Sequence, residues 1–166
     1  AMIEHIDFSS RKYEDVEQCR RLFHGRGCAY PGLEHVTIDW LPPVVLITLY
    51  KEESPEWVLN LAQELERNLP SCRSVQVQYR CRPKAPFELL LGEELSELIA
   101  DEHGLKFNVQ LGRSQNTGLF MDMVNGHEWV RQNSTGKRVL NLFAYTCAFS
   151  VAAIAGGASY VLNVDV

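Results

Sequence analysis

Apolar residues recur at helical intervals in two segments of the first half of the chain. The first segment runs from Arg11 to His24 and is followed by glycines, which predicts an amphipathic helix. The second begins at Ser54, and the Pro55 and Glu56 that follow are typical of a helix N-terminus. Its apolar stripe at three- and four-residue spacing predicts a helix that ends near Pro70.

Short β-branched or alternating runs fill most of the remaining sequence up to about Gly112. The pair Pro42-Pro43 separates two of these runs and suits a turn or a sheet edge. A further run alternates valine and tyrosine with polar residues, which predicts a half-buried strand, and Glu102 to Gly104 suits a hairpin turn. The predicted strands are His35–Trp40, Val44–Tyr50, Ser74–Cys81, Glu88–Leu91, Leu98–Asp101 and Lys106–Leu111. This part of the chain is therefore predicted to be α+β.

The pattern changes after a short polar segment, Asn125–Asn133, which predicts a linker helix. The run Val139–Ala144 is continuously apolar, as expected of a parallel strand covered on both faces. The small apolar residues of Phe149–Ala155 predict a helix, and Tyr160–Val166 predicts a second buried strand. These three segments form a β-α-β unit, which cannot cover both faces of its own sheet. We therefore expect the chain to be a fragment, or the rest of the sheet to lie outside it.

Length, charge and cysteine content narrow the possible classes of protein. The 166 residues suit one medium domain or two small ones, and the net charge of −5 argues against a protein that coats nucleic acid by net charge alone. No apolar run is long enough to cross a membrane and the start lacks a signal-peptide pattern, so we expect a cytoplasmic protein. The five cysteines and the histidines lack metal-ligand spacing, and we expect no metal site.

The strand-to-helix turn of the β-α-β unit, residues 141–150, is the first candidate for chemistry, because open parallel sheets bind ligands at the carboxyl ends of their strands. Asp165 follows Phe143 by 22 residues (165 minus 143), close to the spacing that places a carboxylate on a ribose. The turn contains no glycine, whereas dinucleotide sites use several, which argues against a cofactor such as NAD. S-adenosylmethionine has a ribose but no phosphate, and Asn141, Tyr145 and Thr146 could contact it.

Two linked motifs resemble a known family. The segment Asn141–Ala153, followed by Gly156-Gly157-Ala158 and Val164-Asp165, resembles the cofactor-binding first motif of class I methyltransferases related to the bacterial 23S ribosomal RNA methyltransferases. Upstream, Asn116–Asp122 is similar to the Thr-Gly-Leu-Phe-Leu-Asp segment that precedes this motif in the same family. The resemblance covers about Gln115 to Val166.

This resemblance implies an α/β fold: a small α+β accessory domain over residues 1–113 and the beginning of a Rossmann-like domain over residues 114–166. Asp165 would hold the ribose hydroxyls of S-adenosylmethionine, and the turn would surround its methionine part. The cofactor-binding residues implied are Asn141, Phe143, Ala144, Tyr145, Thr146, Phe149, Asp165, Phe120 and Asp122. Cys147 departs from the family, which usually has glycine there. The acceptor-side motif lies outside this sequence, so no catalytic residue is assigned.

Two groups of basic residues in the sequence indicate an RNA partner. They are Arg20, Arg21 and Arg26 in the first group, and Arg80, Arg82 and Lys84 in the second. Such side chains contact phosphates and stack on bases, although a solvated helix face and a basic turn would have the same composition. Our leading hypothesis is a methyltransferase that uses S-adenosylmethionine and methylates a base of 23S ribosomal RNA. The alternatives are a non-catalytic RNA-binding module and a nucleotide-dependent oxidoreductase. The missing glycines argue against the oxidoreductase.

Overall fold

Five strands form one sheet in the computed structural model, which describes residues 2–6, 8 and 18–166. Their order in the sheet follows the sequence, with β3 and β4 parallel and the other neighbouring pairs antiparallel. The turn between β2 and β3 contains a cis Pro42-Pro43 peptide bond. The strands are β1 (Arg20–His24), β2 (Val36–Leu41), β3 (Val44–Leu49), β4 (Ser74–Tyr79) and β5 (Phe87–Gly92).

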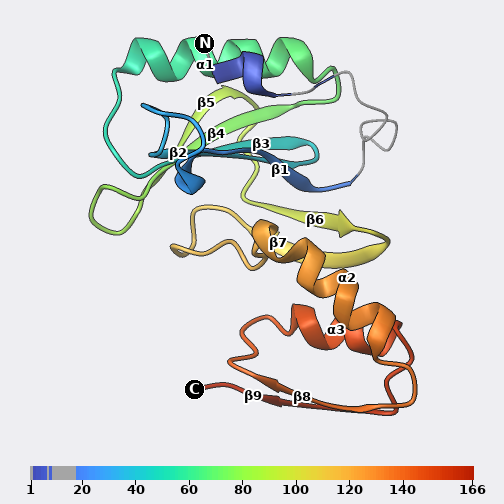
Figure 1. Ribbon diagram of the computed structural model, residues 1–166. Coiled ribbons are helices and arrows are strands. Elements are labelled where there is room, and N and C mark those ends of the chain that lie inside the picture. Colours follow the sequence, from blue (N-terminus) through green and yellow to red (C-terminus); the bar gives the residue numbers. More distant parts are fainter. Residues whose placement is uncertain (1, 7, 9–17) are drawn as a thin grey trace.

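Helix α1 (Pro55–Asn68) connects β3 to β4 and covers one face of this sheet (Figure 1). The Ser54 hydroxyl accepts a hydrogen bond from the Trp57 backbone N–H at 3.2 Å, as the N-cap pattern predicts. The helix buries Val58, Leu61 and Leu65 against the valine and isoleucine side chains of β2, β3 and β4. The predicted helix and the two β-branched strands are therefore confirmed.

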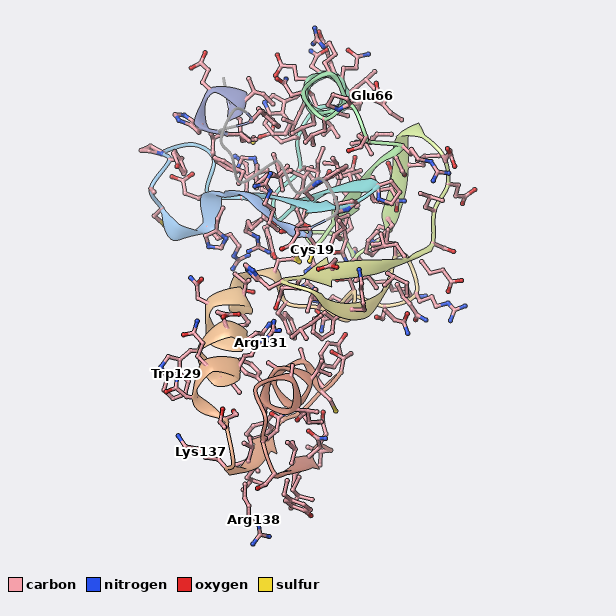
Figure 2. All side chains as sticks on the ribbon, turned by 90° about the vertical axis from the view of Figure 1, so that its right-hand side faces the viewer. Cys19, Glu66, Trp129, Arg131, Lys137 and Arg138 are labelled. Carbon is pink, nitrogen blue, oxygen red and sulfur yellow. The ribbon has the colours of Figure 1, made fainter. Side chains whose placement is uncertain are left out.

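The opposite face of the sheet is covered in part by a hairpin of β6 (Glu97–Glu102) and β7 (Leu105–Gln110). Leu46 of β3 and Phe107 of β7 belong to the apolar cluster between the two sheets, and Figure 2 shows Cys19 between them. Strand β4 is consequently buried on both faces, so the prediction of a half-buried strand was wrong. The sequence pattern of one strand does not reveal that a distant hairpin will cover its polar side.

The predicted β-α-β unit is present as β8 (Arg138–Leu142), α3 (Ala148–Ala155) and β9 (Tyr160–Val164), with parallel strands. Helix α2 (Val124–Asn133) precedes it and packs against α3. Figure 1 shows α3 between the two strands and the hairpin layer. The prediction that β8 is covered on both faces is wrong for this structure: Leu140 and Leu142 are 58% and 55% exposed.

The predicted amphipathic helix over Arg11–His24 is wrong in its second half. Residues 11–17 lie outside the described residues, and Arg20–His24 forms strand β1, which pairs with β2. Phe23 is buried in the core of the structure, and as an apolar position of the predicted helix it is also expected to be buried. Pairing to an existing sheet edge satisfies the backbone over this segment and overrides its weak helical periodicity.

In the part of the chain that the structure describes, short 3₁₀ helices lie at η1 (Met2–His5), η3 (Gly25–Gly27) and η4 (Met121–Met123). Within residues 2–6, 8 and 18–166, every helix is too short or too polar to cross a bilayer.

Candidate cofactor site and adjoining cavity

The turn after β8 has an unusual backbone conformation. Phe143, Tyr145 and Cys147 have φ angles of 55°, 49° and 65°, in the left-handed region that normally favours glycine. Two backbone hydrogen bonds stabilise the turn, from Ala144 N to Val164 O at 3.2 Å and from Cys147 N to Ala144 O at 2.7 Å. The turn thus reaches conformations typical of glycine-rich ligand-binding loops without containing a glycine.

Asp165 lies directly after β9 and beside this turn. Its carboxylate accepts hydrogen bonds from the backbone N–H of Tyr145 and, at 2.8 Å, from that of Val166. An ionised carboxylate has about four acceptor positions, so these two bonds leave capacity for ligand hydroxyls. The residue is exposed, and the structure brings it next to the turn across 20 residues of sequence.

The side chain of Asn141 is not placed for direct contact with a ligand. Its side-chain amide is buried and donates to Ser150 Oγ at 2.8 Å and to Asn163 Oδ1 at 3.2 Å. Ser150 Oγ also donates to Asn163 Oδ1. This network joins β8, α3 and β9 beneath the turn, so the Asn141 side chain fixes the spacing of the three elements.

The upstream segment contacts the turn, as the linked motifs suggest. Thr146 Oγ1 donates to the Gly118 carbonyl at 2.6 Å, and the Phe120 and Tyr145 rings lie 5.4 Å apart. Phe143, by contrast, is 82% exposed, while Ala144 is buried. Phe149 packs edge-on against the His127 ring at 4.5 Å, so it supports α3 from below the turn.

A polar cavity of about 370 Å³ adjoins this segment on its other side. Phe120 and Asp122 line it, together with residues of β1 to β4. Three of the six basic residues that we singled out in the sequence also line it: Arg21, Arg26 and Arg80. Residues from far apart in the chain therefore meet between the five-stranded sheet and the segment that leads to the turn.

The other three basic residues do not line the cavity. Arg82 is held by Glu52 at 2.7 Å and Glu88 at 3.1 Å, and its guanidinium lies 3.6 Å from the centre of the Tyr79 ring. Lys84 has a φ of 64° in the loop after β4, and Arg20 belongs to β1 next to Arg21. The structure thus divides the six basic residues into three that line the cavity and three that lie elsewhere.

Sequence reasoning missed the polar floor of the cavity. Thr37 and Asp39 of β2 and Thr48 of β3 lie on the sheet face opposite α1 and line the cavity. Their alternation with valine, isoleucine and tryptophan was a usable signal, because alternate residues of a strand point to opposite faces. The β-branched composition of the two runs predicts strands but does not by itself reveal this polar face.

An ion pair crosses this floor. Arg21 Nε lies 2.8 Å from Asp39 Oδ1, and Arg21 Nη2 lies 3.3 Å from Oδ2 of the same carboxylate. Burial raises the pKa of the Asp39 carboxyl, and the guanidinium opposes that rise. Within the described residues, no group of three or more His, Cys, Asp or Glu side chains is placed to hold a metal ion.

Comparison with known proteins gives consistent matches. The family model for S-adenosylmethionine-dependent methyltransferases matches residues 20–166. Ribosomal RNA large subunit methyltransferase I of Photobacterium profundum is 33% identical over 141 residues, which is 81% of this chain and 36% of that protein. A solved structure from Streptococcus mutans, assigned as a SAM-dependent methyltransferase, has 28% identity and a TM-score of 0.80 over 99% of this chain and 44% of its own.

Another solved methyltransferase, SMU.776, was determined in complex with SAH. It has 28% identity and a TM-score of 0.80, and the match covers 99% of this chain and 43% of that one. The chain described here spans less than half the length of these relatives.

Proposed function

The chain belongs to the S-adenosylmethionine-dependent methyltransferase family, and we propose that it is part of an enzyme that methylates a base of large-subunit ribosomal RNA. The observation that carries the proposal is the left-handed turn after β8 with Asp165 bonded to its backbone. The name of the Photobacterium profundum relative supports ribosomal RNA as the substrate. A protein of this family is expected to use S-adenosylmethionine rather than NAD, so the oxidoreductase alternative loses its support.

In this proposal Asp165 binds the ribose hydroxyls of the cofactor through its free acceptor positions. The exposed Tyr145 and the backbone of the turn face the methionine part, and Phe120 closes the pocket from the upstream segment. We assign cofactor binding to Asn141, Phe143, Ala144, Tyr145, Thr146, Phe149, Asp165, Phe120 and Asp122, with Asn141 and Phe149 acting through the position of the turn and Asp122 acting from the adjoining cavity, which it lines.

The cofactor supplies an electrophilic methyl group on a sulfonium. This chain's residues bind and orient that group, which is the main requirement of an in-line methyl transfer. The five-stranded sheet and the β6–β7 hairpin lie before residue 114 and share no strand with the β8–β9 sheet, which supports our division of the chain into an accessory domain over residues 1–113 and a cofactor domain that begins at residue 114. We further propose that the basic residues of the accessory domain face the RNA.

Calorimetry with SAH tests the cofactor assignment. Asp165→Ala removes the carboxylate, and we expect SAH affinity to fall by about 10- to 100-fold, since hydrogen bonds to a charged group contribute about 1.5–3 kcal/mol each. Glu66→Ala is a matched control, because Figure 2 shows Glu66 on α1, at the opposite end of the molecule from β8 and β9. Equal affinities for the two variants would refute the proposed site.

Methylation of deproteinised ribosomal RNA with radiolabelled S-adenosylmethionine, by the enzyme of which this chain is proposed to be part, tests the substrate. The proposal predicts label in large-subunit RNA and none in small-subunit RNA or transfer RNA. Label in transfer RNA alone would refute the substrate while leaving the cofactor site intact.

A further inference from the structure

The cavity beside the upstream segment has a polar floor made by a sheet. In β2 and β3, one set of alternate residues packs under α1, and the other set includes Thr37, Asp39 and Thr48. Gln78 of β4 continues this floor. All four residues are at most 6% exposed, so the floor presents buried hydrogen-bonding groups rather than an apolar surface.

One of these groups lacks a partner. The Thr37 side-chain oxygen is buried, and no described residue forms a hydrogen bond with it. Gln78 is occupied, because its amide nitrogen donates to the Ala85 and Gln115 carbonyls at 3.3 and 2.9 Å. A buried hydroxyl without a partner costs free energy, and a base that reaches it, by rotation of the Thr37 side chain toward the cavity, would satisfy it.

Two arginine side chains and an aromatic ring form part of the rim of the cavity. The Arg26 guanidinium lies 3.8 Å from the centre of the Tyr50 ring, within cation-π distance. Arg80 donates to the Gln115 carbonyl at 3.1 Å and approaches Asn116 Oδ1, which fixes it beside the same ring. Both arginines are exposed or half-exposed. With Arg21 they face two carboxylates that also line the cavity, Asp39 and Asp122, so the cavity keeps a local excess of positive charge in a chain whose net charge is −5.

The cavity also adjoins the proposed cofactor turn. Phe120 lines the cavity and lies 5.4 Å from the Tyr145 ring of the turn. A strand of RNA that places one base at the turn would therefore bring a neighbouring nucleotide to the cavity. The volume of about 370 Å³ lies at the lower end of the range for small-ligand sites, which suits one base with its sugar.

We propose that this cavity binds one unstacked RNA nucleotide next to the one that is methylated. The base rests on the sheet floor and hydrogen-bonds to the Thr37 hydroxyl, while Arg26 and Arg80 face the phosphates. The inference rests on the proposed function for the identity of the polymer. Single-stranded RNA is recognised in this way, by contacts to unstacked bases combined with a basic surface along the backbone.

Two labelled probes separate base recognition from phosphate binding. The first is a set of short oligoribonucleotides of adenosine, cytidine or uridine, and the second is an abasic sugar-phosphate oligomer of the same length. Fluorescence anisotropy gives the affinity for each. Thr37→Val keeps the shape of the side chain and its strand propensity but removes the hydroxyl. We expect it to weaken binding of at least one base-containing probe by about fivefold, the effect of one hydrogen bond, and to leave the abasic probe unchanged.

Arg26→Gln should weaken the base-containing and abasic probes alike, by about three- to tenfold, because phosphate contacts do not depend on the base. Arg73→Gln is the matched control: Arg73 pairs with Glu93 and does not line the cavity, so its loss of one positive charge should leave both probes nearly unchanged. Thermal unfolding of each variant verifies that it is folded. If Thr37→Val and Arg26→Gln behave like Arg73→Gln, the proposal is overturned.

SAH calorimetry on the same variants distinguishes this inference from the proposed function. Normal SAH binding with lost RNA affinity in Thr37→Val and Arg26→Gln supports the nucleotide site. Normal SAH binding and unchanged RNA affinity overturn the nucleotide site and leave the methyltransferase proposal standing. Failure of the unaltered protein to bind SAH refutes the cofactor assignment, while the comparison of the two probes still decides what the cavity binds.

Discussion

Nδ1 of His127 lies 2.6 Å from Oε1 of Glu102, and the two side chains are only 4% and 3% exposed. The pair joins α2 to the end of strand β6. The His127 ring also contacts Phe149 of α3 and lies 6.4 Å from the centre of the Phe107 ring of β7. One histidine therefore links the hairpin layer to the β8–α3–β9 unit through both a buried hydrogen bond and ring packing.

Replacing this histidine should destabilise the protein strongly. His127→Ala removes the hydrogen bond and the ring contacts, and it leaves Glu102 buried with neither carboxylate oxygen paired among the described residues. We expect the free energy of unfolding to fall by about 2–4 kcal/mol. Urea unfolding measures the change.

Trp129→Ala on the same helix is the control. Trp129 is 65% exposed, and Figure 2 shows its side chain pointing away from the molecule. An exposed substitution of this kind is expected to change stability by less than about 0.5 kcal/mol. Similar losses in the two variants would contradict the role given to the buried pair.

Gly156 sets the distance between α2 and the end of α3. A Cβ atom at this position would lie 1.9 Å from the Arg131 carbonyl oxygen, which belongs to the α2 backbone and cannot rotate away. Gly156→Ala must therefore push the two helices apart, and we expect a loss of about 3 kcal/mol in thermal or urea unfolding.

Gly27→Ala provides the comparison, since the nearest atom to its added Cβ is a His24 ring carbon at the ordinary distance of 3.6 Å. This variant should remain within about 1 kcal/mol of the unaltered protein. A mild effect at Gly156 would mean that the helices separate at little cost.

The sequence was most informative where one local signal determined the structure. The N-cap at Ser54 and the apolar stripe after it were sufficient to define α1, and the hairpin turn at 102–104 was read correctly. The prediction of a helix over Arg20–His24 failed because the alternative was pairing with β2, a segment more than ten residues away. Local periodicity cannot weigh a distant partner that satisfies the whole backbone of a strand.

The two candidate sites also differ in whether local sequence spacing reveals them. The turn and Asp165 could be found from spacing, because a β-α-β unit fixes where the two strand ends meet. The cavity could not, since Arg21, Arg80 and Asp122 come together only through the packing of the sheet on the upstream segment. The left-handed angles of the turn were also hidden, because none of the residues that adopt them is glycine.

The hairpin turn should make stability depend on pH under acidic conditions. Lys106 binds the Asp101 carboxylate, and the Gly104 backbone N–H donates to it at 2.8 Å. Both interactions, the lysine first, hold the pKa of Asp101 below its ordinary value. A carboxyl group with a lowered folded-state pKa contributes stability above its unfolded pKa of about 3.9, and this contribution is lost as the pH falls through the folded pKa.

Asp101→Asn tests this dependence by urea unfolding at several pH values. We expect the unaltered protein to be more stable than the variant by up to about 1 kcal/mol at neutral pH, with the difference constant down to about pH 5 and shrinking below about pH 4. A difference that grows toward acid pH would have the opposite sign and would contradict the assignment.

Cys147 occupies the position at which the resembling family usually has glycine, and its φ of 65° explains that preference. A side chain in the left-handed region costs about 1 kcal/mol relative to glycine. Cys147→Gly should therefore raise the stability of the protein by about 0.5–1 kcal/mol and leave SAH affinity unchanged, because the turn keeps its conformation. Cys147→Val should lower both the stability and the SAH affinity, since a β-branched residue fits this region poorly.

Cys81→Gly is the control, at a position outside the left-handed region. It should instead lose about 0.5 kcal/mol of stability through the added freedom of the unfolded chain. If glycine stabilised both positions equally, the gain at Cys147 could not be attributed to its backbone angle.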